Sequence, residues 1–163
     1  MRRLAPVLAL SLLPLLACSN DEGGGDSGPS LEERREAYVS DAEEVCTDAN
    51  AEVAEIPTPT SVDTVAAYAD EVVAVLQRTV DQVSALEPPE EDKAELEEKV
   101  LSPLSSDAGV AEQYAADVGT AAEANDQAAL LQLVQQLPQT SADLDFMREY
   151  GLVECAKAAD TSS

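Results

Sequence analysis

The sequence contains no histidine and no tryptophan, and aromatic residues make up only 3% of its 163 residues. Histidine is the most frequent general base in enzymes and the most frequent metal ligand, and it is the side chain that titrates near neutral pH. Serine, aspartate and glutamate are plentiful, but no histidine or lysine is placed to activate one of them as a nucleophile. The cysteines do not have metal-ligand spacing, and no glycine-rich loop follows a strand. We therefore expect no catalytic residues, no cofactor and no metal site.

Positive charge is also scarce. The chain has nine Lys and Arg against 33 Asp and Glu, which gives a net charge of −24. Nucleic-acid binding depends on basic side chains that neutralise phosphates, so we exclude nucleic acid as a partner. Anionic lipid headgroups would repel such a domain, and its high negative charge favours solubility.

The acids form several clusters along the chain. They are Glu32-Glu33, Asp41-Glu43-Glu44, Glu90-Glu91-Asp92 and Glu95-Glu97-Glu98. Converging carboxylates are able to hold calcium or a cationic ligand, although on an amphipathic helix such clusters are far more often the solvated face. A small cationic ligand therefore stays open as an alternative partner.

No apolar run reaches the roughly 20 residues that a membrane-spanning helix needs. The longest run covers residues 4–16, is broken only by Ser11, Pro6 and Pro14, and follows Arg2 and Arg3. A short basic start followed by an apolar stretch of this length is the layout of a signal peptide.

The run ends in Leu15-Leu16-Ala17-Cys18, which resembles the bacterial lipobox. The resemblance implies cleavage after Ala17 and a diacylglyceryl thioether on Cys18, which makes residues 1–17 a lipoprotein signal peptide. The alternative is an ordinary secreted protein, but Leu15 is bulky where ordinary signal cleavage requires a small residue. We expect the mature protein to be attached to the cell membrane, on the extracytoplasmic face, through the lipid on Cys18.

Cleavage at this point would leave seven Lys and Arg against 33 acids, a net charge of −26. Residues 18–30 would then be a lipidated cysteine followed by a linker rich in Gly, Ser and Asp. A linker of this composition behaves as a flexible coil with a root-mean-square span of roughly 20 Å. That length is enough to hold a domain clear of the headgroups.

Cysteine is rare, with three in the chain. An odd number in an exported protein leaves one cysteine to be explained. If Cys18 carries lipid, Cys46 and Cys155 remain, and we predict that they form a disulfide. Two free buried thiols are the alternative, which an oxidising compartment disfavours. The closed loop holds over 100 residues, so the chain-entropy model gives about 4 to 5 kcal/mol of stabilisation.

Apolar residues recur every three or four positions, and no stretch alternates with a period of two. We predict helices over residues 31–56, 62–86, 90–124 and 127–150. Ser30 and Glu33 have the spacing of a capping box, and Gly151 is placed to end the last helix. We expect Pro103 and Pro138 to kink the third and fourth helices. The alternative for the third is a break, with residues 105–107 capping a second piece.

Short turns between four helices predict an all-α fold, an antiparallel up-down-up-down four-helix bundle over residues 31–157. Residues 158–163 are expected to form a frayed tail. At about 1.5 Å per residue, Cys46 stands about 22 Å above the base of the bundle, and the last helix ends about 18 Å above it. The two cysteines therefore come to similar heights on neighbouring helices.

The order of Tyr38, Cys46, two proline turns and a late Tyr150-Gly151-Leu152 before Cys155 resembles small exported helical lipoproteins of actinobacteria. The resemblance covers residues 31–157 and implies no activity. We expect a membrane-anchored, non-enzymatic protein that binds an envelope protein or has another role in the envelope. The alternative is a solute- or cation-binding lipoprotein that serves a transporter.

Overall fold

The computed structural model describes residues 28–160, and the regular structure in this part of the chain is entirely helical. The elements are α1 (Leu31–Glu55), α2 (Val62–Ala85), α3 (Lys93–Leu96), the π-helical turn η1 (Glu97–Leu101), α4 (Ser102–Glu123), α5 (Gln127–Val134), α6 (Leu144–Tyr150) and α7 (Val153–Ala159). The predicted all-α class is confirmed. The predicted signal peptide, Cys18, almost all of the linker and residues 161–163 lie outside the described residues.

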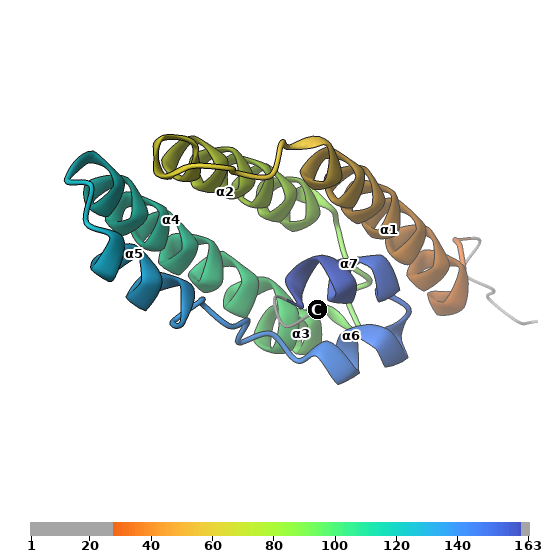
Figure 1. Cartoon of the computed structure of the whole chain (residues 1–163). Helices are drawn as coiled ribbons and strands as arrows, with labels where there is room; N and C mark the ends of the chain where they lie inside the picture. Colours follow the sequence, from red (N-terminus) through yellow and green to blue (C-terminus); the bar gives the residue numbers. More distant parts are fainter. Residues whose placement is uncertain (1–27, 161–163) are drawn as a thin grey trace, which may run out of the picture.

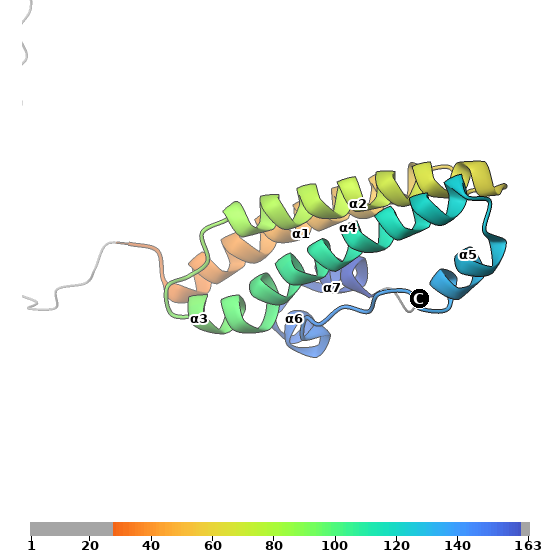
Figure 2. The same cartoon turned by 90° about the vertical axis from the view of Figure 1, so that its left-hand side faces the viewer.

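Three long helical segments form the frame of the domain. α1 and α2 run side by side in opposite directions, and α4 returns along α2 (Figure 1, Figure 2). α5 then folds back along α4 at the end of the molecule that lies far from residue 28 (Figure 2). The last helix, α7, packs against α1.

Local capping signals define where the helices begin. Ser30 and Glu33 form the predicted capping box, with Oγ of Ser30 accepting from the N–H of Glu33 at 3.2 Å. In return the N–H of Ser30 donates to Glu33 at 2.7 Å, and this bond lowers the pKa of the Glu33 carboxyl. Ser61 is the N-cap residue of α2, and Asp126 caps α5 by accepting from two backbone N–H groups. Each of these polar side chains lies at a helix start predicted from sequence.

The predicted continuation of the third helix through Pro103 is confirmed, because α3, η1 and α4 follow one another without a gap from Lys93 to Glu123. The helical start lies at Lys93, three residues after the predicted one. Proline has no N–H to donate to the carbonyl four residues earlier, which here is Lys99. The backbone N–H of Asp143 donates to that carbonyl instead, at 2.9 Å. A distant part of the chain thus satisfies the acceptor that the proline leaves open.

The prediction of a single helix over residues 127–150 is wrong. α5 ends at Val134, residues 135–143 form a non-helical connecting segment, and α6 begins at Leu144. Pro138 disfavours a helical backbone at the residue before it and has no N–H to give. A fourth long helix is therefore missing from the described part of the chain.

Asp107 on α4 holds this connecting segment in place. Its carboxylate accepts from the Thr140 hydroxyl at 2.8 Å and from both the N–H and the hydroxyl of Ser141 at 2.7 Å. Together with the bond from Asp143 to the Lys99 carbonyl, these contacts give the backbone hydrogen-bond partners that a helix would have supplied. Where a kinked helix was predicted, the chain instead forms a non-helical segment that is hydrogen-bonded to α4.

Gly151 ends α6 as predicted, with a φ of 106° in the left-handed region that glycine adopts without strain. The N–H groups of Gly151 and Leu152 donate back to the carbonyls of Arg148 and Met147 at 3.3 and 2.8 Å, which is a Schellman motif. This turn lets Leu152 fold into the core, where it is buried. α7 follows directly and extends to Ala159, so helical structure passes the predicted boundary at residue 157.

The core lies toward the end of the molecule where α1 begins. Its largest fully buried side chains are Leu96, Val100, Met147 and Leu152, which come from α3, η1, α6 and the turn before α7. Alanine, valine and leucine supply most of the remaining core, as the composition requires. By contrast, α5 has no buried residue.

Candidate functional site

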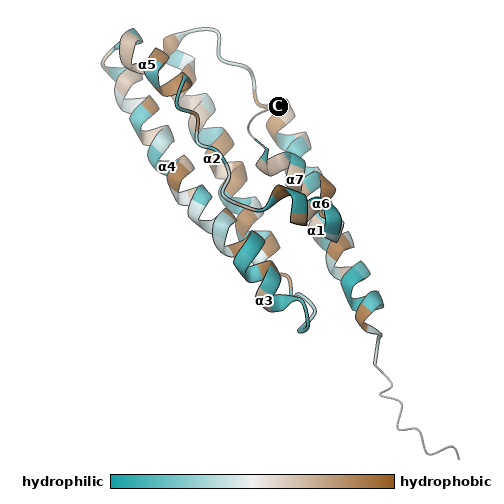
Figure 3. Ribbon diagram, turned by 90° about the horizontal axis from the view of Figure 1, so that it is seen from below, coloured by the Kyte–Doolittle hydropathy of each residue, from teal (hydrophilic) through white to brown (hydrophobic). Residues whose placement is uncertain are grey.

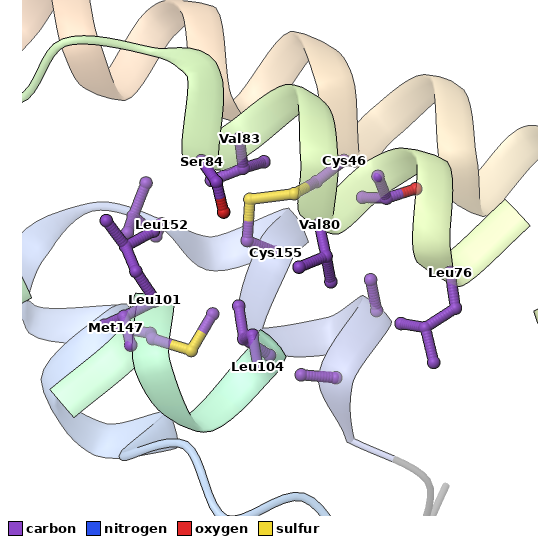
Figure 4. A pocket seen from close by; sticks show the side chains of 14 residues that line it. Cys46, Leu76, Val80, Val83, Ser84, Leu101, Leu104, Met147, Leu152 and Cys155 are labelled. Atoms are coloured by element: carbon purple, nitrogen blue, oxygen red, sulfur yellow. A yellow bond between two sulfur atoms is a disulfide. The ribbon is translucent and has the colours of Figure 1, made fainter. Parts of the chain in front are cut away.

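Cys46 on α1 and Cys155 on α7 form the predicted disulfide, with their Cα atoms 5.0 Å apart (Figure 4). Both cysteines are buried. Because α7 is a separate short helix, the bond does not join two long neighbouring helices as the height argument assumed. The disulfide attaches the C-terminal part of the described chain to the middle of α1.

Two polar side chains of α1 complete this attachment. The Glu43 carboxylate accepts from the N–H of Glu154 at 2.9 and 3.0 Å and from the N–H of Cys155 at 3.2 Å. Asn50 donates to the carbonyl of Glu154 at 3.2 Å. The sequence analysis placed Glu43 in a solvated acidic cluster and missed this role. The available signal was its position three residues before Cys46, on the same side of the helix.

A small apolar recess lies beside the disulfide, between α2, the start of α4, α6 and α7 (Figure 4). Its walls are almost entirely hydrophobic and include Leu76, Val80, Leu104 and Met147. The cavity volume is about 40 Å³. Sites for small molecules are commonly 300–1,000 Å³. The recess is therefore a packing space rather than a ligand pocket.

Arg35, Asp92 and Tyr150 form a polar cluster near the start of α1. The guanidinium of Arg35 bonds both carboxylate oxygens of Asp92, at 2.7 and 2.6 Å, and the Tyr150 hydroxyl donates to the same carboxylate at 2.8 Å. The bonds from Arg35, followed by that from Tyr150, lower the pKa of Asp92, while burial raises the pKa of Tyr150. The cluster ties α1 to the turn before α3 and to α6.

Three of the five aromatic residues pack around this cluster. Tyr150 stacks on Phe146 at 5.7 Å between ring centroids and meets Tyr38 edge to face at 6.3 Å. Arg35 lies 5.5 Å from the centre of the Tyr150 ring, and Lys99 lies 4.5 Å from the centre of the Phe146 ring. These contacts are structural, because each ring or cation is engaged by another side chain of the same domain.

The Tyr38 hydroxyl is an exception within this region. It is buried and has no hydrogen-bond partner among the described residues. Burial raises the pKa of the Tyr38 phenol, so the side chain stays neutral. An unpaired buried hydroxyl is a cost to stability.

Two of the four acidic clusters form ion pairs within the described residues. Glu91 pairs with Arg34 at 2.6 Å, and Lys99 pairs with Glu95 at 2.6 Å. Across residues 28–160, no group of three or more Cys, Asp or Glu side chains is arranged to hold a metal ion. Nor does any helix in that range have the length and apolar character needed to cross a membrane.

The surface of α5 is a further feature of the molecule. Leu131 and Val134 on α5 are 65% and 62% exposed, and Leu137 in the connecting segment is 49% exposed. We call these three residues the α5 surface. No charged residue occurs from position 127 to position 142, although 26% of the whole chain is charged. This surface was not predicted from the sequence, because residues 127–150 were expected to form a helix that faces the core.

Comparison with known proteins adds no family to this picture. A scan against protein-family models finds no match, and searches of curated proteins and of solved structures find no similar protein. The function must therefore be argued from the geometry.

Proposed function

We propose that the protein is a lipid-anchored, extracytoplasmic binding protein without enzymatic activity, and that its α5 surface contacts the partner. The observation that carries the proposal is the exposure of the α5 surface in a chain that is otherwise rich in acids. Exposed leucine and valine side chains grouped at one place are typical of interaction sites. The scarcity of catalytic residue types supports a binding role.

The position of the α5 surface also supports a tethered protein. α1 begins at the end of the molecule where the linker would enter, and α5 lies at the opposite end (Figure 2). α4, which spans most of this distance, has 22 residues and is about 33 Å long. A domain attached through Cys18 would thus present the α5 surface away from the lipid headgroups.

We infer that the architecture is a modified antiparallel bundle. α1, α2 and α4 supply three long members, and the fourth position is divided between α5, the connecting segment, α6 and α7. This division supports the binding role, because it leaves α5 on the outside of α4 instead of in a core.

Palmitate labelling tests the anchor. We expect labelled protein from the wild-type chain and no label on Cys18→Ser, because the thioether requires that sulfur. Cys46→Ser is the matched control, and it should keep the label. Equal labelling of Cys18→Ser and the wild type would disprove the lipid anchor.

Site-specific photo-cross-linking in the native envelope tests the binding surface. A photoreactive amino acid at position 131 should give a discrete cross-linked product. The control position is Val153 on α7, which is 53% exposed but lies outside the α5 surface. Products of the same mass and yield from both positions, or none from position 131, would contradict the proposal.

A further inference from the structure

We propose that the partner of the α5 surface is a basic amphipathic segment of another protein, a helix with Lys or Arg beside an apolar face. This inference rests on the proposed function and specifies the chemistry of the partner.

Half of the apolar side chains of α5 are exposed to solvent. Six of its eight residues are Ala, Leu or Val, yet none is buried. Leu130 and Leu133 are half-buried where α5 packs against α4. Leu131 and Val134, spaced three residues apart, share another side of the helix and are exposed. Brown hydrophobic stretches on α5 are visible at one end of the molecule (Figure 3).

The charges around α5 are of one sign. Residues 62–77 of α2 together with residues 108–134 carry seven Asp and Glu and no Lys or Arg. Arg78 follows directly on α2 and pairs with Glu52 of α1 at 2.6 Å. These two segments run from the end of the molecule that includes the α5 surface toward its middle (Figure 1). The basic residues Arg34, Arg35 and Lys99 instead lie near the opposite end, where they pair with acids. An uncharged apolar centre therefore lies in a part of the molecule whose charged residues on these segments are acidic, and we call these seven acids the acidic surround.

This distribution of apolar and acidic residues favours one kind of binding partner for the α5 surface over the others. A second copy of the chain would bring two acidic surrounds together, and an anionic lipid surface would be repelled in the same way. A segment with Lys or Arg flanking apolar residues matches both the centre and the surround. Amphipathic helices commonly bind by placing their apolar face on such a surface.

A peptide-binding measurement tests the proposal. The protein is the mature chain from residue 18 to residue 163 carrying Cys18→Ser, so that no lipid is attached. The probe is a 14-residue peptide of Leu and Lys arranged as an amphipathic helix. A scrambled peptide of the same composition is the control. We expect the amphipathic peptide to bind at least tenfold more tightly than the scrambled one, with an affinity that falls as salt is raised.

Matched variants locate the site. Leu131→Gln combined with Val134→Gln should weaken binding of the amphipathic peptide at least tenfold, whereas Val153→Gln should leave it unchanged. All three side chains are exposed, so the fold should persist, and an unchanged circular dichroism spectrum checks this. Equal affinity for the two peptides, or an equal effect of the control variant, would overturn the proposal.

The remaining outcomes are also decisive. Self-association that strengthens with salt, seen by sedimentation, would identify a second copy as the occupant and overturn the basic partner. A cross-linked product from position 131 without binding of the amphipathic peptide would leave the proposed function standing and remove this inference alone. If neither a cross-linked product from position 131 nor binding of the amphipathic peptide is observed, the α5 surface is not a binding site.

Discussion

At the scale of single residues, two neighbouring tyrosines have opposite energetic roles. The rings of Tyr38 and Tyr150 meet edge to face, but only the Tyr150 hydroxyl has a partner among the described residues, the Asp92 carboxylate at 2.8 Å. A hydrogen bond to a charged acceptor stabilises a fold, whereas a buried unpaired hydroxyl destabilises it. Replacing each tyrosine by phenylalanine should therefore change the free energy of unfolding in opposite directions at the two positions.

We predict that Tyr38→Phe raises the free energy of unfolding by about 1 kcal/mol, because it removes an unpaired buried hydroxyl. Tyr150→Phe should lower it by about 1.5 kcal/mol, because Asp92 loses a donor. Urea unfolding of both variants and the wild type measures the two changes. A loss of stability in Tyr38→Phe would show that its hydroxyl is satisfied in solution.

At the scale of elements, the connecting segment depends on one side chain of α4. Asp107 accepts three hydrogen bonds from Thr140 and Ser141 and so holds residues 135–143 against the long helix. We predict that Asp107→Ala lowers the free energy of unfolding by about 2 kcal/mol and speeds amide exchange at Ser141. Chemical denaturation and hydrogen exchange measure these effects.

Asp117→Ala is the matched control, since Asp117 is an exposed acid of the same helix that accepts a hydrogen bond from Gln113, one turn away. It should change neither stability nor the exchange of Ser141 by a measurable amount. Equal effects of the two substitutions would show that loss of an acid, rather than loss of the tertiary bonds, is responsible.

The elements also show which features the sequence could predict. The capping box of Ser30 and Glu33 and the glycine stop at Gly151 depend on residues close together in the chain, and both are confirmed. The break after Val134 depends on partners far away, above all Asp107 and the Lys99 carbonyl. The apolar period through residues 130–144 matched a helix, but periodicity does not include such tertiary bonds.

The α5 surface could not be predicted for the same reason. Whether Leu131 is buried depends on what lies opposite it, and a helix continued to residue 150 would have placed its apolar stripe in the core. The disulfide, by contrast, was predicted by counting cysteines, which needs no geometry. The height argument that accompanied it assumed an unbroken last helix and was wrong in that respect.

At the scale of the whole molecule, the disulfide closes a large loop. Cys46 and Cys155 are separated by 109 positions. We predict that the double variant Cys46→Ala with Cys155→Ala loses about 4 to 5 kcal/mol of unfolding free energy, chiefly because the unfolded chain is no longer constrained. Thermal and denaturant unfolding measure the loss, and Cys18→Ser should leave the stability unchanged. A loss below about 1 kcal/mol would contradict the entropic account.

The disulfide also sets how far the α5 surface can travel from the anchored end under mechanical load. Along the backbone, 100 residues separate Leu31 from Leu131, roughly 340 Å when fully extended. Through the bond between Cys46 and Cys155 the shortest covalent path has 39 residues, roughly 130 Å. If a bound partner pulled on α5 until every helix gave way, the oxidised chain would extend less than half as far as the reduced one. A buried bond in the core therefore limits the reach of a surface at the other end of the molecule.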